Sequence, residues 1–117
     1  MQIHLSPRHL RLTAAIHQHA ASRVEQLEEF VSGIVAAHVV LIHDETAKPD
    51  DRYSVKVHLA LPGPDIHAEE SHADLYAAMD LVMDKLGRQL RKRKTRLTDK
   101  RRARTGKIIR HRKLNGA

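Results

Sequence analysis

Residues 71–97, SHADLYAAMDLVMDKLGRQLRKRKTRL, carry the pattern that decides the fold. Apolar side chains recur there every three or four positions, which predicts one long amphipathic helix. Ser71 and Asp74 have the spacing of a capping box and mark its predicted start. The second half of the segment is strongly basic and carries Lys85, Arg88, Arg91, Lys92, Arg93, Lys94 and Arg96. One end of this helix can therefore pack on a core, while the other end must face anions.

Charge is distributed unevenly along the chain. The 117 residues carry a formal net charge of +7. Residues 1–84 hold six basic and thirteen acidic side chains, a net charge of −7, whereas residues 85–117 hold fifteen basic and one acidic, a net charge of +14. This asymmetry indicates a polyanionic partner, with nucleic acid the first choice and an anionic membrane surface the second. A basic segment that serves only solubility is the plain alternative, but it would not need to continue an amphipathic helix.

The residues before the long helix contain four strand patterns and one helix pattern. Alternating or β-branched side chains predict strands at residues 2–6, 34–43, 52–61 and 65–69. A helix is predicted from Ala14, with Thr13 as its N-cap and Gly33 at its end. Its apolar stripe consists of Ile16, Ala20, Val24, Leu27 and Val31.

The order of these segments predicts an α+β fold of the type β-α-β-β-β-α. Two amphipathic helices need one apolar face to cover, and a four-stranded sheet with one apolar face provides it. We therefore expect both helices on the same face of the sheet. Residues 1–97 are predicted to form this domain, and residues 98–117 a basic tail without fixed structure.

Composition excludes several classes of protein. The length fits one domain, and the absence of cysteine excludes disulfide scaffolds and thiolate zinc sites. A reducing, cytoplasmic location is expected for the same reason. The sequence contains neither a signal-peptide pattern nor an apolar run long enough for a membrane span. Only Phe30, Tyr53 and Tyr76 are aromatic, so stacking on bases by these rings is restricted.

Ten histidines raise the question of a metal site. His17 and His19 lie two apart on a predicted helix and point in different directions. His4, His58 and His67 would share the polar side of the sheet if their strands are neighbours. Without cysteine beside them, we expect surface or hydrogen-bonded histidines and no metal. No nucleophile elbow or phosphate-binding glycine loop appears, so we expect no enzyme, no cofactor and no small-molecule substrate.

The basic half of the long helix is the strongest functional signal. At about 100° per residue, four of its cations lie on one stripe: Lys85, Arg88, Lys92 and Arg96. A neighbouring stripe is apolar and consists of Leu86, Leu90 and Leu97. Arginine can bind a phosphate through two hydrogen bonds and lysine acts as a point charge. Because such contacts do not read base sequence, the expected target is structured RNA recognised by its shape.

Five segments occur in an order and spacing that is specific in combination: HVVL at 38–41, PGPDIHAE at 62–69, LYAAMDL at 75–81, DKL at 84–86 and RQLRK at 88–92. Together with the opening MQI and the pair Arg8-His9, they resemble the ribosome hibernation-promoting factors and the related ribosome-associated inhibitor A, in their short form. The similarity covers about residues 1–97. The chain departs from that family at Pro7, where glycine is usual, and at Gly87, where an acidic residue is common.

The resemblance implies a domain similar to double-stranded-RNA-binding domains. It implies a factor that binds the decoding channel of the small subunit of the bacterial ribosome through 16S ribosomal RNA. There it would block mRNA and tRNA and inhibit translation in stationary phase or stress. The implied rRNA-binding residues are Arg8, Arg23, Lys85, Arg88, Arg91, Lys92 and Lys94. Auxiliary nucleic-acid contacts are expected from Arg96, Lys100, Arg101, Arg102 and Arg104.

Several alternatives stay open at this point. A general double-stranded-RNA-binding module would have the same electrostatics without a single target. A small RNA hydrolase would need a catalytic constellation that the sequence does not offer. A membrane binder would need Trp or Phe in the basic half of the helix, which has neither. The free protein is expected to be a monomer, and the resemblance leaves open whether it promotes ribosome dimerisation or holds single inactive ribosomes.

Overall fold

The computed structural model describes the backbone of residues 1–110 and the side chains of residues 1–93. Its elements are β1 (Gln2–Arg8), α1 (Ala14–Gln26), η1 (Leu27–Glu29), β2 (Ala36–His43), η2 (Pro49–Asp51), β3 (Tyr53–Ala60), β4 (Ile66–His72) and α2 (Leu75–Arg110). This order confirms the predicted β-α-β-β-β-α chain and its α+β class. The two 3₁₀ turns, η1 and η2, are additions that the sequence patterns did not predict.

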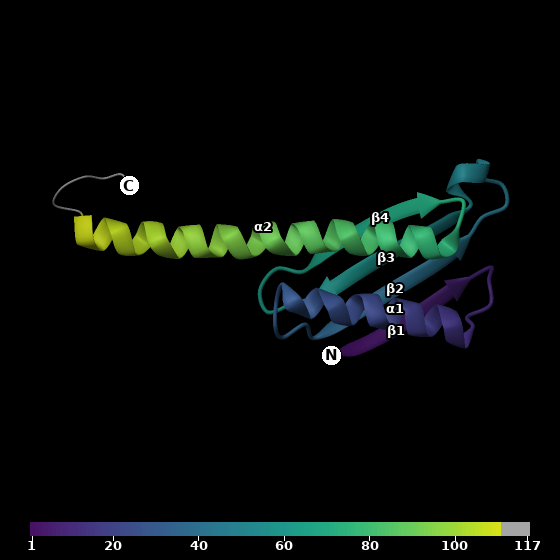
Figure 1. Cartoon of the computed structure of the whole chain (residues 1–117), viewed down its shortest axis with the longest axis horizontal. Coiled ribbons are helices and arrows are strands. Elements are labelled where there is room, and N and C mark those ends of the chain that lie inside the picture. The colour runs from purple at the N-terminus through teal and green to yellow at the C-terminus, as the bar shows by residue number, and fades with distance from the viewer. Residues whose placement is uncertain (111–117) are drawn as a thin grey trace.

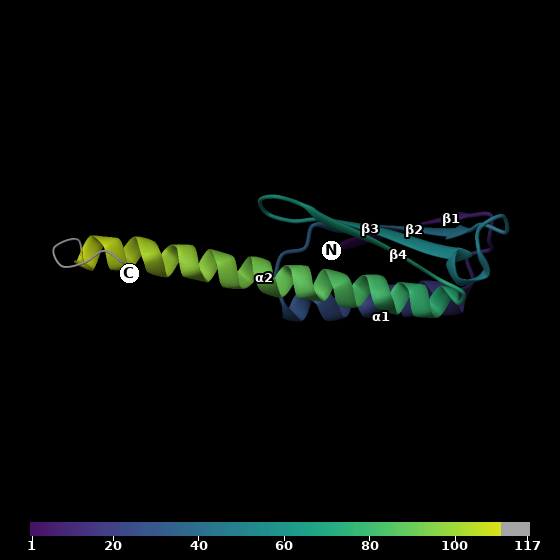
Figure 2. The same ribbon diagram turned by 90° about the horizontal axis from the view of Figure 1, so that it is seen from above.

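The four strands form one mixed sheet with both helices on the same face. The strand order is β1-β2-β3-β4, in which β1 and β2 are parallel and the other pairs are antiparallel. α1 connects the parallel pair, as a parallel connection requires. Seen from above, α1 and α2 lie side by side below the sheet, and no element of residues 1–110 covers the opposite face (Figures 1 and 2). The sheet therefore has one packed face and one open face.

The core lies between the sheet and the helices, where the described residues of both predicted helical stripes are found. Alternate residues of β3 point into it, and Val55, Val57 and Leu59 are no more than 1% exposed. From α1, Ile16, Ala20 and Val24 are buried against them. From α2, the buried side chains are Leu75, Ala78, Met79, Val82, Met83, Leu86 and Leu90. The apolar half of α2 is thus fixed on the sheet from its first residue to Leu90.

The start of α2 differs from the prediction. Ser71 is not part of a capping box but lies in β4, where it pairs with Ser54 and the two hydroxyls are 2.9 Å apart. Asp74 lies next to the helix start, and its carboxylate accepts a hydrogen bond from the backbone N–H of Tyr76 at 3.3 Å. The strand ladder therefore prevails over the local capping pattern at Ser71, and Asp74 alone provides a cap.

The end of α2 also differs from the prediction. The helix continues to Arg110, thirteen residues beyond the predicted end at Leu97, and its 36 residues correspond to a length of about 54 Å. The backbone of residues 98–110, which was expected to lack fixed structure, is therefore helical. The division of the chain into a domain and a tail stays a prediction. No helix within residues 1–110 has the length and apolar character needed to cross a membrane.

Two further boundaries have simple physical reasons. β1 continues through Pro7 to Arg8, and an edge strand tolerates proline because its outer N–H groups need no partner. α1 ends at Gln26 rather than at Gly33, and the tighter turn η1 follows it. That turn still buries Leu27, which is 3% exposed, so the predicted apolar stripe survives the change of helix type.

Candidate nucleic-acid interface

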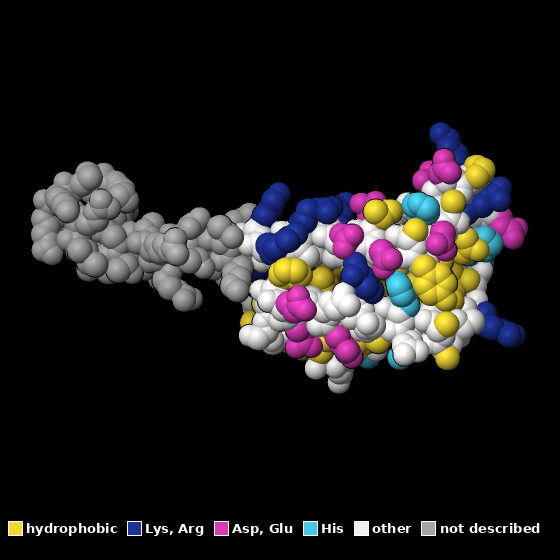
Figure 3. All heavy atoms as spheres, in the orientation of Figure 1, with side chains coloured by type: hydrophobic (Ala, Val, Ile, Leu, Met, Phe, Trp, Pro, Cys, Tyr) yellow, Lys and Arg dark blue, Asp and Glu magenta, His cyan; other side chains and the backbone are white. Residues whose placement is uncertain are grey.

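The candidate interface is the face of α2 that points away from the sheet. Arg88, Arg91 and Lys92 are exposed there, directly beyond the buried residues Leu86 and Leu90. Of the two predicted stripes, Arg88 and Lys92 are thus exposed and Leu86 and Leu90 buried, whereas Lys85 is half-buried and the side chains of Arg96 and Leu97 lie outside the described residues. Figure 3 shows the same division on the helix side of the molecule, with Lys and Arg gathered over α2 where the described side chains end and acidic side chains spread over α1 and the start of α2.

Arg91 is held in place by an aromatic ring from the end of η1. Its guanidinium carbon lies 5.3 Å from the centre of the Phe30 ring, a cation–π arrangement. The ring packs against α2 at Gly87, where a Cβ atom would lie 3.4 Å from Phe30 Cε2 and 3.9 Å from Leu27 Cδ2, which are van der Waals contact distances. Phe30 was not among the predicted site residues. Its position in the sequence, far from α2, does not indicate that it contacts Arg91.

An open hollow of about 310 Å³ lies between α1, η1 and α2. Cationic side chains from both helices line it, namely Arg23, Arg88 and Arg91. Asp84 and Glu29 line it too, so the hollow is mixed in charge rather than purely basic. Of the cations, Arg88 and Arg91 are the exposed ones.

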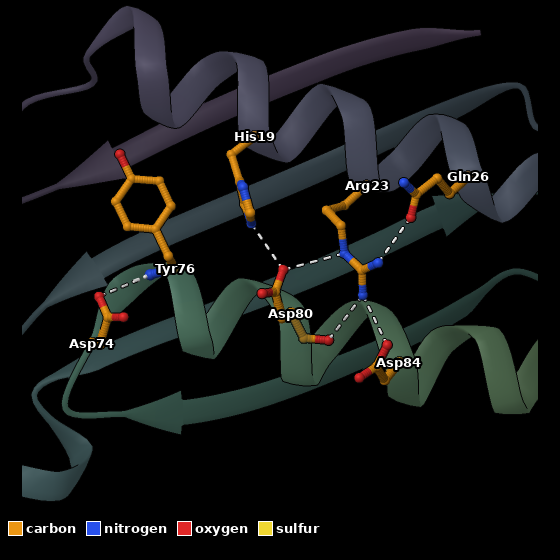
Figure 4. Close-up of polar contacts among 7 residues, drawn as sticks. All are labelled: His19, Arg23, Gln26, Asp74, Tyr76, Asp80 and Asp84. Atoms are coloured by element: carbon orange, nitrogen blue, oxygen red, sulfur yellow. Dashed lines mark hydrogen bonds and ion pairs between the residues drawn. The ribbon is translucent and has the colours of Figure 1, made fainter.

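Arg23 is predicted to bind RNA, but in the structure it bridges the two helices. Its Nη2 lies 2.8 Å from Oδ1 of Asp84 and its Nε lies 3.2 Å from Oδ1 of Asp80. The contact with Asp80 is an ion pair without hydrogen-bond geometry, since Nε is buried with no hydrogen-bond partner. His19 reaches Asp80 at 2.8 Å and Gln26 accepts a hydrogen bond from Arg23 (Figure 4). Both terminal nitrogens of the Arg23 guanidinium are therefore already hydrogen-bonded to groups of its own protein, and Nε is ion-paired with Asp80.

The remaining predicted contacts are dispersed. Lys85 is half-buried, with its Nζ 3.7 Å from Oε1 of Glu70 on β4. Arg8 is exposed at the end of β1, and strand alternation places it on the open face of the sheet, away from α2. The side chains of Lys94, Arg96, Lys100, Arg101, Arg102 and Arg104 lie outside the described residues. Among the predicted rRNA-binding residues, the structure thus brings together Arg88, Arg91 and Lys92, with Arg23 beside them.

Arg93 has a different role from its basic neighbours. One of its guanidinium nitrogens donates a hydrogen bond to the carbonyl oxygen of Pro62 at 2.6 Å. This contact fastens α2 to the turn between β3 and β4. The turn comes close enough because Gly63 has a φ of 88° and lacks a Cβ, which would meet Nη2 of Arg93 at 3.0 Å. Helical periodicity predicts that Arg93 lies outside the cationic stripe, but it does not predict the contact of Arg93 with Pro62.

No group of three or more histidines and acids within residues 1–93, whose side chains the structure describes, is arranged to hold a metal ion. His58 instead contacts Asp65, with Nε2 and Oδ2 2.9 Å apart. The pKa of Asp65 lies below its ordinary value, first because the backbone N–H of Leu61 donates to its carboxylate at 3.0 Å and then because of His58. This is a hydrogen-bonded histidine of the kind the sequence led us to expect.

The comparison with known proteins decides the family. The sequence profile of the family described as Sigma 54 modulation protein / S30EA ribosomal protein matches residues 3–98. The chain belongs to this family. The predicted family is thereby confirmed, and the S30EA profile covers all strands, α1 and the packed half of α2.

Two curated relatives in the S30EA comparison carry related names. A "Ribosome hibernation promotion factor" from Deinococcus radiodurans is 40% identical over 97 residues, which are 82% of this chain and 51% of that protein. A "Ribosome hibernation promoting factor" from Escherichia coli K12 is 31% identical over 97 residues, which are 83% of this chain and 97% of that protein. The chain therefore matches about half the length of the first relative. Both names are those of ribosome factors rather than enzymes, which confirms the expectation that this chain is not an enzyme.

Solved structures confirm the fold. The N-terminal domain of Protein Y from Thermus thermophilus is similar with a TM-score of 0.66 and 29% identity, over 79% of this chain and 98% of that one. A ribosomal subunit interface protein from Coxiella burnetii has a TM-score of 0.71 at 23% identity, over 81% and 99%. The second likeness concerns the fold alone.

Proposed function

We propose that this protein is a ribosome hibernation factor. It binds the small subunit of the bacterial ribosome through 16S ribosomal RNA, occupies the decoding channel, and so blocks mRNA and tRNA and inhibits translation in stationary phase or stress. The names of its relatives at 40% and 31% identity support this proposal. The function requires occupancy rather than chemistry, which agrees with a family of ribosome factors.

The observation that carries the proposal is the cationic face of α2. Arg88, Arg91 and Lys92 project from a helix that is fixed on the sheet by Leu86 and Leu90, so the backbone that carries them is in place before RNA binds. Phosphate contacts from such cations provide affinity and orientation without reading sequence. An RNA of defined shape is the target that a row of charges on a fixed helix can select.

Sedimentation with purified bacterial ribosomes tests the proposal. The full chain is mixed with ribosomes at near-physiological salt, in the presence of excess unrelated duplex RNA. The test variant is Arg88→Ala/Arg91→Ala/Lys92→Ala. The matched control is Arg11→Ala/Lys48→Ala/Arg52→Ala, which removes three exposed cations elsewhere and gives the same net charge. We expect the wild type and the control to co-sediment with the small subunit and the test variant to remain in the supernatant.

Two outcomes would contradict this proposal. Release of the wild type by the duplex competitor would favour the general double-stranded-RNA-binding module. Equal binding by a folded test variant would show that the α2 cations are not the interface. The same gradient addresses ribosome pairing, since a particle heavier than single ribosomes would show that this protein promotes dimerisation.

A further inference from the structure

Four histidines form a row across the open face of the sheet. The strand register places His4 beside His38, His38 beside His58, and His58 beside His67, so each strand contributes one ring. Neighbouring ring centres are 4.9, 6.4 and 6.4 Å apart. We call these four residues the histidine row. Sequence reasoning placed His4, His58 and His67 on this side, but His38 lies in an apolar run and was missed.

The histidine row is accessible and has few partners. All four side chains are exposed, and both helices lie on the other face of the sheet (Figure 2). His4 approaches the Gln2 side chain at 3.4 Å and His58 contacts Asp65. Neither His38 nor His67 has a side-chain hydrogen bond or a carboxylate partner among residues 1–93. Most of the hydrogen-bonding capacity of the row is therefore free.

The groups around the row are balanced in charge at neutral pH. The next positions along the sheet bring Lys56 and Glu69, whose charged groups are 3.7 Å apart. Arg8 stands at the end of β1 on the same face, and Asp65 faces the row from the turn before β4. An imidazole side chain ordinarily gains its positive charge between pH 8 and 5. Each proton that binding adds to the row would therefore give positive charge to a face whose other charged groups cancel.

A row of adjacent rings favours one kind of partner. Neighbouring positive rings repel each other unless negative charge lies over them, so a chain of phosphates and a protonated row stabilise each other. Exposed rings on a four-stranded sheet can also stack on bases, and only an unpaired strand presents both its bases and its phosphates. The large apolar side chains on β2 between the histidines and the end of this face are Val40 and Ile42, and both are half-buried. This face therefore offers little apolar surface to a protein partner.

We propose that the histidine row is a second RNA-binding surface, which takes a single-stranded segment and binds it more tightly as the pH falls. It lies on the opposite face from Arg88, Arg91 and Lys92, so it goes beyond the function proposed above. Binding takes up protons: each imidazole that becomes charged in the complex steepens the pH dependence of the affinity by a factor of about ten per pH unit at most.

The test measures binding of the full chain to a labelled 12-nucleotide oligouridine at pH 7.5 and pH 6.0, at constant ionic strength. The variant is His38→Gln/His58→Gln, which keeps polar side chains on the sheet surface. The control is His9→Asn/His17→Gln, which removes two exposed histidines outside the row. Asparagine suits position 9 because its φ is 59°. We expect the affinity of the wild type and the control to rise about tenfold or more at pH 6.0, and that of the row variant to rise less than about threefold.

Separate arms distinguish this surface from α2. The variant Arg88→Ala/Arg91→Ala/Lys92→Ala should bind more weakly at both pH values and keep the acid-dependent gain. An unchanged gain in the row variant, or no gain in the wild type, would overturn the proposal. An equal gain with a 12-base-pair RNA duplex would overturn the single-stranded assignment.

A direct readout covers the case in which the row variant does not fold. The ring Hε1 resonances of the wild type are titrated with and without oligouridine. We expect the titration midpoints of His38 and His67 to rise by at least half a pH unit with RNA, on the order of a threefold change in the proton affinity. Unmoved midpoints under saturating RNA would contradict proton-linked binding on this face.

Discussion

Replacing Arg23 by glutamine separates its two candidate roles. In the structure Arg23 pairs with Asp80 and Asp84, and its side chain is only 26% exposed. Glutamine keeps most of the aliphatic stem but leaves the two carboxylates, four residues apart on α2, without this partner. If Arg23 serves the helix contact, the variant loses stability. If it serves RNA, the variant loses binding at unchanged stability.

The size of the stability loss follows from exposure. Asp80 and Asp84 have side chains 47% and 59% exposed, so solvent screening limits each pair to about 0.5 kcal/mol. Repulsion between carboxylates four positions apart on a helix reduces the stability by about a further 0.3 kcal/mol. We therefore expect Arg23→Gln to reduce the free energy of unfolding by about 1 to 2 kcal/mol, with a drop in the melting temperature of about 5–10 °C.

Urea unfolding of four proteins measures this contribution. They are the wild type, Arg23→Gln, Asp84→Asn and the double variant, and the cycle should give a coupling energy of about 0.5 kcal/mol. Arg11→Gln, at an exposed position, is the control and should change stability by less than about 0.5 kcal/mol. A variant with wild-type stability and lost ribosome binding would refute the bridging role and restore Arg23 to the RNA contacts.

The other predictions concern the core, the end of the chain and acid stability. Leu86→Ala should reduce the free energy of unfolding by about 2–5 kcal/mol, because Leu86 is fully buried between α2 and the sheet, and a thermal melt with an unchanged midpoint would contradict the packing of α2. Deletion of residues 98–117 should leave the melting temperature nearly unchanged while it reduces the salt dependence of ribosome binding; a large loss of stability would show that this segment packs on the domain. Asp65 has a folded pKa below its ordinary value of 3.8, so it stabilises the fold above about pH 4, and this contribution disappears as the pH falls through the folded pKa. Asp65→Asn should therefore be less stable than the wild type at pH 7 and show a smaller loss on acidification, as followed by circular dichroism, whereas identical pH profiles would contradict the hydrogen bond from Leu61.

The elements could be predicted from local patterns because each pattern reports burial of one face. The stripes of α1 and α2 and the alternation in β3 all face the core as expected. The wrong predictions occur where a contact with another segment determines the local secondary structure. Ser71 has a capping spacing, but its neighbour across the sheet, Ser54, keeps it in β4. The sequence predicts that α2 ends at Leu97, whereas the helix continues to Arg110. The composition of the segment shows its charge but not whether the helix continues through it.

The site was predicted only in part, for a similar reason. Helical periodicity on one segment is enough to place Arg88 and Lys92 opposite Leu86. The partners of Arg23 and Arg91 belong to another helix, and their meeting depends on how α1 and η1 are rotated against α2. No sequence pattern of a single chain contains that rotation. The histidine row depends on strand register in the same way, since His4 and His38 are neighbours only because β1 pairs with β2 in parallel.

The parallel pair of β1 and β2 also has a consequence for the order of folding. β2, β3 and β4 are joined by short connections, so they can pair early in folding. β1 is separated from β2 by α1 and η1, so their pairing requires the closure of a much longer loop. We expect Leu5→Ala to speed unfolding without slowing folding, and Val57→Ala to slow folding, in stopped-flow measurements. During synthesis on a ribosome, the first residues to emerge would thus be the last to form their native contacts.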